Sequence, residues 1–120
     1  MFSFFKRTRQ LIQRKSPRRE ADQFLTVYDE DQFIMLGRVV DLSIGGMCVV
    51  SELSIQLGNI VKLAIEVPLA NGKTEIFWVD CESVWQKEKN DLNRIGFRFI
   101  HLSPRNNWRI RKIMEQQQLR

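Results

Sequence analysis

The stretch GRVVDLSIGGMCVV, residues 37–50, places an Asp-x-Ser-x-x-Gly core between two apolar runs. The two glycines in this core predict a turn that joins two strands. Residues i and i+2 of a strand point to the same face, so Asp41 and Ser43 project together, on the face opposite Val40 and Leu42. If the two apolar residues pack into a core, the carboxylate and the hydroxyl face outward.

The same alternation gives Arg38 the core-facing side of the strand, where an unpaired charge would be costly. Gly37 precedes it, and a glycine inside a strand often marks a bulge. A bulge at Gly37 would turn the Arg38 side chain outward.

Strand-like segments with turn signals between them recur about every ten residues along the rest of the chain. A helix is predicted for residues 104–119, because Ser103 is a favourable N-cap and Pro104 suits the first helical position. Asn71-Gly72 is a strong hairpin signal. The pattern favours an antiparallel barrel or a sandwich with one terminal helix. The predicted strands are residues 24–29, 33–43, 47–52, 60–67, 73–88 and 94–102.

The chain has 120 residues, which is one domain's worth. No apolar run reaches the roughly 18–20 residues that span a bilayer, and the apolar patch at the start does not have the form of a secretory signal. We therefore expect a cytoplasmic protein. Cys48 and Cys81 lack metal-ligand spacing and are expected to be small buried residues. His101 has no partner motif, and no metal site or catalytic set is expected.

The net charge of +5 is unevenly distributed. Residues 1–20 carry seven Lys or Arg and one acidic residue, whereas residues 21–120 carry twelve and thirteen. We interpret residues 1–13 as a tail or short helix, and residues 14–22 as a basic arm of a domain that covers residues 14–120. Such an asymmetry favours an anionic partner for the arm.

The arm has the form Arg-x-x-x-Arg at Arg14 and Arg18. In an extended segment the two guanidiniums would lie roughly 13 Å apart along the backbone, which suits a ligand with two phosphates or several base edges. Guanidinium groups bind phosphate and the O6 and N7 atoms of guanine in a bidentate manner, and they stack on bases.

These motifs together resemble the PilZ domain family. The Arg-x-x-x-Arg arm and the later Asp-x-Ser-x-x-Gly match two of its elements, and RIGFRFIHLSPRNN (residues 94–107) is similar to its last strand and the start of its C-terminal helix. The resemblance covers roughly residues 14–115. One departure is Lys15, at a position near which the family often has an arginine doublet, so a second register from Lys15 to Arg19 is possible.

The resemblance implies a six-stranded antiparallel Greek-key-like barrel that binds cyclic di-GMP, a bacterial second messenger, without a metal or another cofactor. It implies that Asp41 accepts N–H bonds from a guanine edge, that Ser43 binds base or phosphate, and that Gly46 keeps the turn open. Arg14 and Arg18 would take phosphate and guanine. Lys15, Arg19 and Gly45 would support the binding of cyclic di-GMP.

We therefore expect a receptor and not an enzyme, one that orders its arm on ligand binding and signals to an unidentified partner protein, for example in motility or biofilm regulation. Contact with a membrane would be peripheral at most. One alternative is a small basic barrel that binds single-stranded nucleic acid through the basic arm and four cations of the terminal helix, although acidic residues beside Trp78 argue against nucleic acid as a ligand. The four cations are Arg105, Arg109, Arg111 and Lys112. Another alternative is a PilZ-like interaction domain that binds no nucleotide.

Overall fold

Six strands make up most of the described chain, and each lies close to its predicted position. The computed structural model describes residues 25–29 and 34–118. The predicted bounds differ from the observed ones by one or two residues at most ends. The strands are β1 (Leu25–Asp29), β2 (Ile34–Leu42), β3 (Gly46–Ser51), β4 (Ile60–Pro68), β5 (Thr74–Lys89) and β6 (Leu92–Phe99).

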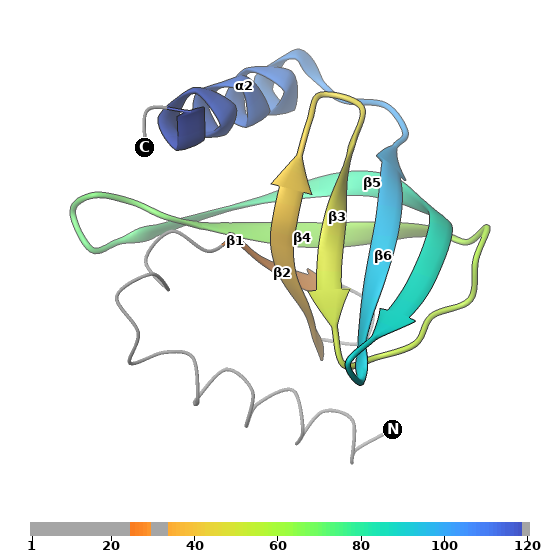
Figure 1. The fold of residues 1–120 in the computed structure, drawn as a ribbon. Coiled ribbons are helices and arrows are strands. Elements are labelled where there is room, and N and C mark those ends of the chain that lie inside the picture. Colours follow the sequence, from red (N-terminus) through yellow and green to blue (C-terminus); the bar gives the residue numbers. More distant parts are fainter. Residues whose placement is uncertain (1–24, 30–33, 119–120) are drawn as a thin grey trace.

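The strands close into a barrel in the order β1-β2-β3-β6-β5-β4 (Figure 1). Every neighbouring pair is antiparallel, and β1 closes the barrel by pairing with β4 from Thr26 opposite Glu66 to Asp29 opposite Leu63. Because β6 lies between β3 and β5, the order is Greek-key-like. The predicted barrel is confirmed, and the sandwich alternative is wrong.

Apolar side chains from all six strands fill the barrel interior. Val27, Val49 and Ile95 are completely buried, and Val49 lies directly opposite Ile95 in the pairing of β3 with β6. Burial of each such side chain stabilises the fold by about 1.5–3 kcal/mol. The strand residues of this core cluster are Leu25, Val27, Leu36, Met47, Val49, Leu63, Ile65, Val67, Phe77, Val79, Cys81, Ile95, Phe97 and Phe99.

The helix α2 (Pro104–Gln118) closes one end of the barrel (Figure 1). It begins as predicted, with the Ser103 hydroxyl accepting a hydrogen bond from the Asn106 N–H at 3.1 Å. Ile110 and Ile113 are buried in the core cluster. An ion pair links the helix to β5, because the Nε of Arg109 lies 3.1 Å from a carboxylate oxygen of Glu75. No helix among the described residues has both the length and the apolar character needed to cross a membrane.

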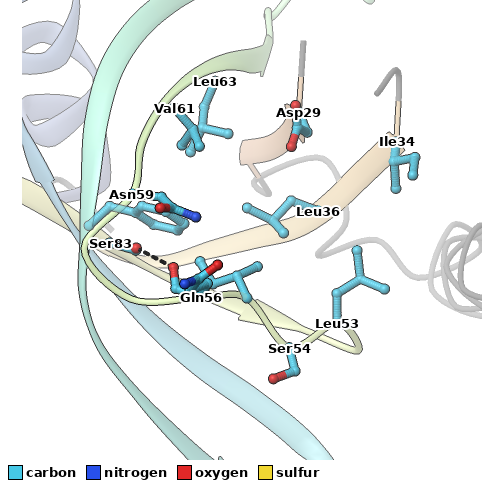
Figure 2. A pocket seen from close by; sticks show the side chains of 12 residues that line it. Asp29, Ile34, Leu36, Leu53, Ser54, Gln56, Asn59, Val61, Leu63 and Ser83 are labelled. Atoms are coloured by element: carbon cyan, nitrogen blue, oxygen red, sulfur yellow. Dashed lines mark hydrogen bonds between the residues drawn. The ribbon is translucent and has the colours of Figure 1, made fainter. Parts of the chain in front are cut away.

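The opposite end of the barrel contains an apolar cavity of about 350 Å³ (Figure 2). Leu36, Leu53 and Leu63 are among its apolar lining residues, and Asp29 lies at its edge. The hydroxyl of Ser83 also lines it but is already engaged, since it donates a hydrogen bond to the backbone carbonyl of Gln56 at 2.9 Å. The two ends of the barrel therefore differ: α2 closes one, and this cavity lies at the other.

Tyr28 lies on the outer surface of β1, where its hydroxyl donates a hydrogen bond to a carboxylate oxygen of Glu66 on β4 at 3.0 Å. Burial, the negative charge of Glu66 and this hydrogen bond together raise the pKa of Tyr28 to about 12. The contact links the two strands that close the barrel.

Replacing Ile110 by Ala should lower the free energy of unfolding by about 2–5 kcal/mol, because it leaves a cavity between α2 and the core. The exposed Gln116 on the same helix is a matched control, and Gln116→Ala should change the stability by less than about 0.5 kcal/mol. Urea denaturation measures both. Equal effects of the two changes would contradict the docking of α2 on the barrel end.

The chain contains one tyrosine, so the ultraviolet absorbance of phenolate reports on Tyr28 alone. We expect it to titrate near pH 12 in the folded protein, compared with the ordinary value of 10.0. Because the folded pKa is the higher one, the stability that this phenol contributes is complete below pH 10 and is lost as the pH rises through 12. Glu66→Gln should lower the pKa only in part, since burial remains. Titration of the native protein at the ordinary value would refute the Tyr28–Glu66 contact.

Candidate functional site

The turn between β2 and β3 is held by hydrogen bonds within the Asp-x-Ser-x-x-Gly segment. The Ser43 N–H and the Ser43 hydroxyl both donate to the carbonyl oxygen of Gly46, at 2.9 and 3.3 Å. The carbonyl of Gly45 accepts a bond from the Phe99 N–H at 2.9 Å, which ties the turn to the end of β6. The Ser43 hydroxyl remains exposed and keeps its lone pairs for a ligand.

A β-bulge in β2 decides which way Asp41 faces. Val39 pairs with Val49 and Asp41 pairs with Cys48, so Val40 is an extra residue without a partner on β3. Val39 consequently packs against the core, whereas Asp41 is exposed on the outer face. The predicted outward direction of Asp41 is correct.

The expected packing of Val40 is wrong, because the bulge leaves this residue 39% exposed. The bulge that was expected at Gly37 is also displaced: the pairing of β1 with β2 skips Leu36 instead. Gly37 lies opposite Val27, a core residue, and Arg38 lies opposite Thr26 on the outer face. Two bulges, one on each side of Arg38, thus replace the single one in the prediction.

A second strand of the same face carries a matching bulge. In the pairing of β5 with β6, Ser83 lies opposite Phe97 and Trp85 lies opposite Gly96, so Val84 is the extra residue. Gly96 also pairs with Cys48 on β3. One outward row therefore crosses four strands, and it consists of Asp41, Cys48, Gly96 and Trp85.

The indole of Trp85 lies over Gly96. A Cβ atom added to Gly96 would come within 2.0 Å of the indole Nε1, so only glycine allows this position of the ring. Trp85 is nevertheless 45% exposed, which leaves a ring face accessible. With Asp41, Ser43 and Gly46 it lines a shallow pocket of about 210 Å³.

This row suits a flat ligand that carries N–H donors. An ionised carboxylate accepts two such bonds, and an indole face stacks on a nucleobase with a gain of about 1–3 kcal/mol. Gly96 is covered by the indole, and the small residue Cys48 between the carboxylate and the indole leaves room for a ring. The arrangement has the groups that such a ligand would need. Among residues 25–29 and 34–118 no group of three or more His, Cys, Asp and Glu side chains could hold a metal ion.

Cys48, in the floor of this pocket, is half-buried and not disulfide-bonded. Burial raises the pKa of its thiol, and the opposing charge and hydrogen bond of Arg94 do not cancel that effect. The thiol is therefore protonated at neutral pH and adds no charge to the pocket.

The glycines of the motif have different structural roles. A Cβ atom on Gly46 would lie 2.1 Å from the carbonyl oxygen of Phe97, so glycine is required there for the close approach of β3 to β6. Gly45 has only the Ser43 hydroxyl nearby, at 3.9 Å. The sequence predicted an open turn at Gly46, and the structure adds this backbone contact.

The structure brings together Asp41, Ser43 and Gly46 at the pocket, whereas Gly45 lies in the same turn without lining the pocket. The four predicted cations of the arm, Arg14, Lys15, Arg18 and Arg19, lie outside the described residues.

Trp85 and Gly96 were missed by the sequence reasoning. An aromatic residue and a glycine in neighbouring strands were visible, but their pairing depends on the unpredicted bulge at Val84.

Comparisons with known proteins identify the fold. A model of the PilZ domain matches residues 12–116. A search of curated proteins gave no match. Among solved structures, the Bacillus subtilis inhibitor of motility (MotI/DgrA) is similar with a TM-score of 0.67 and 20% identity, over 82% of this chain and 48% of that one.

YcgR from Escherichia coli, in complex with c-di-GMP, is similar with a TM-score of 0.63 and 21% identity, over 79% of this chain and 41% of that one. The PilZ domain of YcgR with c-di-GMP gives a TM-score of 0.59 and 24% identity, over 78% of this chain and 79% of that domain. The chain thus spans less than half the length of full YcgR and of the Bacillus protein. At these identities the likeness shows a shared fold.

Replacing Gly96 by Ala should displace the Trp85 indole, because the new methyl group would occupy the position of the ring. We expect a large shift of the Trp85 indole N–H signal in NMR spectra and a lower free energy of unfolding. Gly45→Ala is the control, since its methyl group has open space and should leave that signal in place. An unshifted indole signal in Gly96→Ala would show that the ring does not lie over Gly96.

Proposed function

Because the chain belongs to the PilZ domain family, we propose that it is a receptor for cyclic di-GMP that binds the ligand on the outer face of the barrel, between Asp41 and Trp85. Domains of this family are receptors and not enzymes. The observation that carries the proposal is the outward row of Asp41, Cys48, Gly96 and Trp85, which presents a carboxylate, a small floor and an exposed aromatic ring.

Each group in the pocket has a role in this proposal. Asp41 accepts the N–H bonds of a guanine edge, and Ser43 offers its hydroxyl to base or phosphate. The exposed face of Trp85 stacks on a base. Gly46 keeps β3 close to β6 and so holds the turn in place.

The arm is long enough to take part. Leu25 pairs with Val39, two residues before Asp41, so the described chain starts beside the site. Arg18 and Arg14 precede Leu25 by seven and eleven residues. An extended chain covers about 3.3 Å per residue, so Arg18 has a reach of roughly 23 Å, several times the spacing of about 4.8 Å between strands.

In the proposed mechanism Arg14 and Arg18 close over the bound ligand, with Lys15 and Arg19 as supporting charge. Ordering of the arm would change the surface that residues 1–13 and the barrel present, and an unidentified partner protein would recognise that change. The cytoplasmic location and a role in motility or biofilm regulation remain predictions from the sequence and the family resemblance.

The nucleic-acid alternative receives less support from the structure. Two of the four helix cations on which it relied have acidic partners: Arg109 pairs with Glu75, and Lys112 lies 4.0 Å from Glu115. The third reading, a domain that binds no nucleotide, leaves the outward Asp41 and the exposed Trp85 without a role.

Calorimetric titration of the full chain with cyclic di-GMP tests the proposal. Arg14→Ala, Arg18→Ala and Asp41→Asn should each weaken binding by about tenfold or more, because each removes a hydrogen bond that involves a charged group. The exposed Arg105 on α2 supplies a control for the loss of one positive charge, and Arg105→Ala should bind as the native chain does. GMP should bind more weakly than cyclic di-GMP.

The proposal fails if the native chain does not bind cyclic di-GMP, or if the variants at Arg14, Arg18 and Asp41 bind it unchanged. Binding of mixed-sequence oligonucleotides with a steep salt dependence would favour the nucleic-acid reading instead.

A further inference from the structure

A second outward row of side chains lies beside the pocket, one step closer to the cavity end of the barrel. It crosses the same four strands as the pocket row, since Arg38 pairs with Val50, Val50 with Arg94, and Arg94 with Lys87. Arg94 and Lys87 are exposed, and Arg38 is half-buried. Three cations thus stand on one row of the barrel face.

Arg94 and Lys87 are directly opposite each other on neighbouring strands. Like charges in this position destabilise a sheet. In the part of the chain that the structure describes, no ion pair joins either side chain to a carboxylate. The fold therefore carries an unfavourable pair that a bound anion would turn into a favourable one.

Arg94 lies close to one residue of the pocket. It pairs with Val50, two residues after Cys48, and its charge and hydrogen bond oppose the rise that burial causes in the pKa of the Cys48 thiol, so the Arg94 side chain lies near this thiol. It follows that a molecule seated between Asp41 and Trp85 comes within reach of Arg94.

The row on the other side of the pocket has a different charge. There Arg98 pairs with Gly46 and with Glu82, and its guanidinium forms an ion pair with the Glu82 carboxylate. That row is neutral overall, and Asp41 adds a negative charge to the pocket itself. The positive potential is therefore concentrated on the side of Arg94 and Lys87.

We propose that Arg94 and Lys87 form a phosphate subsite that fixes the direction of the bound ligand: the guanine edge faces Asp41 and the turn at Ser43, and the phosphate faces the cavity end of the barrel. On β3, β6 and β5 this row lies two residues from the pocket row, about 6.6 Å. That separation is comparable to the distance from a base to the phosphate of its own nucleotide. This inference rests on the proposed receptor function and adds an orientation to it.

Titrations of Arg94→Gln and Lys87→Gln with cyclic di-GMP at several salt concentrations test the subsite. Each change should weaken binding roughly tenfold at low salt, and the affinity should fall less steeply with salt than in the native chain. Lys62→Gln on β4 is the matched control, because it removes the same charge from a strand outside this face and should have no effect. Without ligand, Arg94→Gln and Lys87→Gln should be at least as stable as the native chain, since repulsion is relieved.

Guanosine, which has no phosphate, is the second probe, and the Trp85 indole N–H signal follows its binding. Asp41→Asn should weaken both ligands, whereas Arg94→Gln and Lys87→Gln should weaken cyclic di-GMP alone. Equal losses for both ligands, or cyclic di-GMP binding that is unchanged in both variants while Arg14→Ala and Arg18→Ala impair it, would overturn the subsite and leave the receptor function standing. If the native chain does not bind cyclic di-GMP, both proposals fail.

Discussion

The pairing register of β2, β3, β6 and β5 is the constraint on which the rest of the molecule depends. Side chains alternate strictly between the two faces of a strand, so every residue that is in register is committed either to the core or to the outside. The core needs Val49 and Ile95 to face inward. The neighbouring pair in the same ladder, Cys48 and Gly96, must therefore face outward. The pocket row is complete only if the two flanking strands, β2 and β5, also place Asp41 and Trp85 beside this pair.

Two bulges meet that requirement. Each adds one residue beside the Cys48–Gly96 pair, Val40 in β2 and Val84 in β5. The inward packing of Val39 and the outward direction of Asp41 are then compatible, as are the burial of Ser83 and the exposure of Trp85. The core and the pocket thus share strands without competing for the same side chains.

Much of the fold could be predicted from the sequence because its signals are local. Turn residues such as Asn71-Gly72 and the start of α2 at Ser103-Pro104 depend on neighbouring residues only, and both were predicted correctly. The closed barrel order and the two bulges depend on pairing between strands that are distant in sequence. The position of Val40 was therefore wrong, and the place of Trp85 over Gly96 could not be predicted. Asp41 was predicted to face outward, but from an alternation that ignored the bulge.

The barrel face is also divided by charge along its strands. Near the turn at Ser43, the opposite charges of Arg98 and Glu82 neutralise each other. On the far side of the pocket, Arg94 and Lys87 face each other and both are positively charged. The same face therefore has a neutral end close to α2 and a positive end close to the apolar cavity. A polar ligand on this surface meets different surroundings at its two ends.

The bulges at Val40 and Val84 have a consequence for how this surface can change over evolutionary time. In a regular strand the two residues on either side of each extra residue would point to the same face, whereas here the first packs inward and the second, Asp41 or Trp85, faces outward. Straightening a bulge while its extra residue is kept would therefore carry Asp41 or Trp85 to the inside of the wall. Deleting the extra residue would instead leave a regular strand in which both residues keep their directions. The outward direction of Asp41 and Trp85 thus depends on how β2 and β5 pair with β3 and β6, and the same pairing can be reached with or without the extra residue.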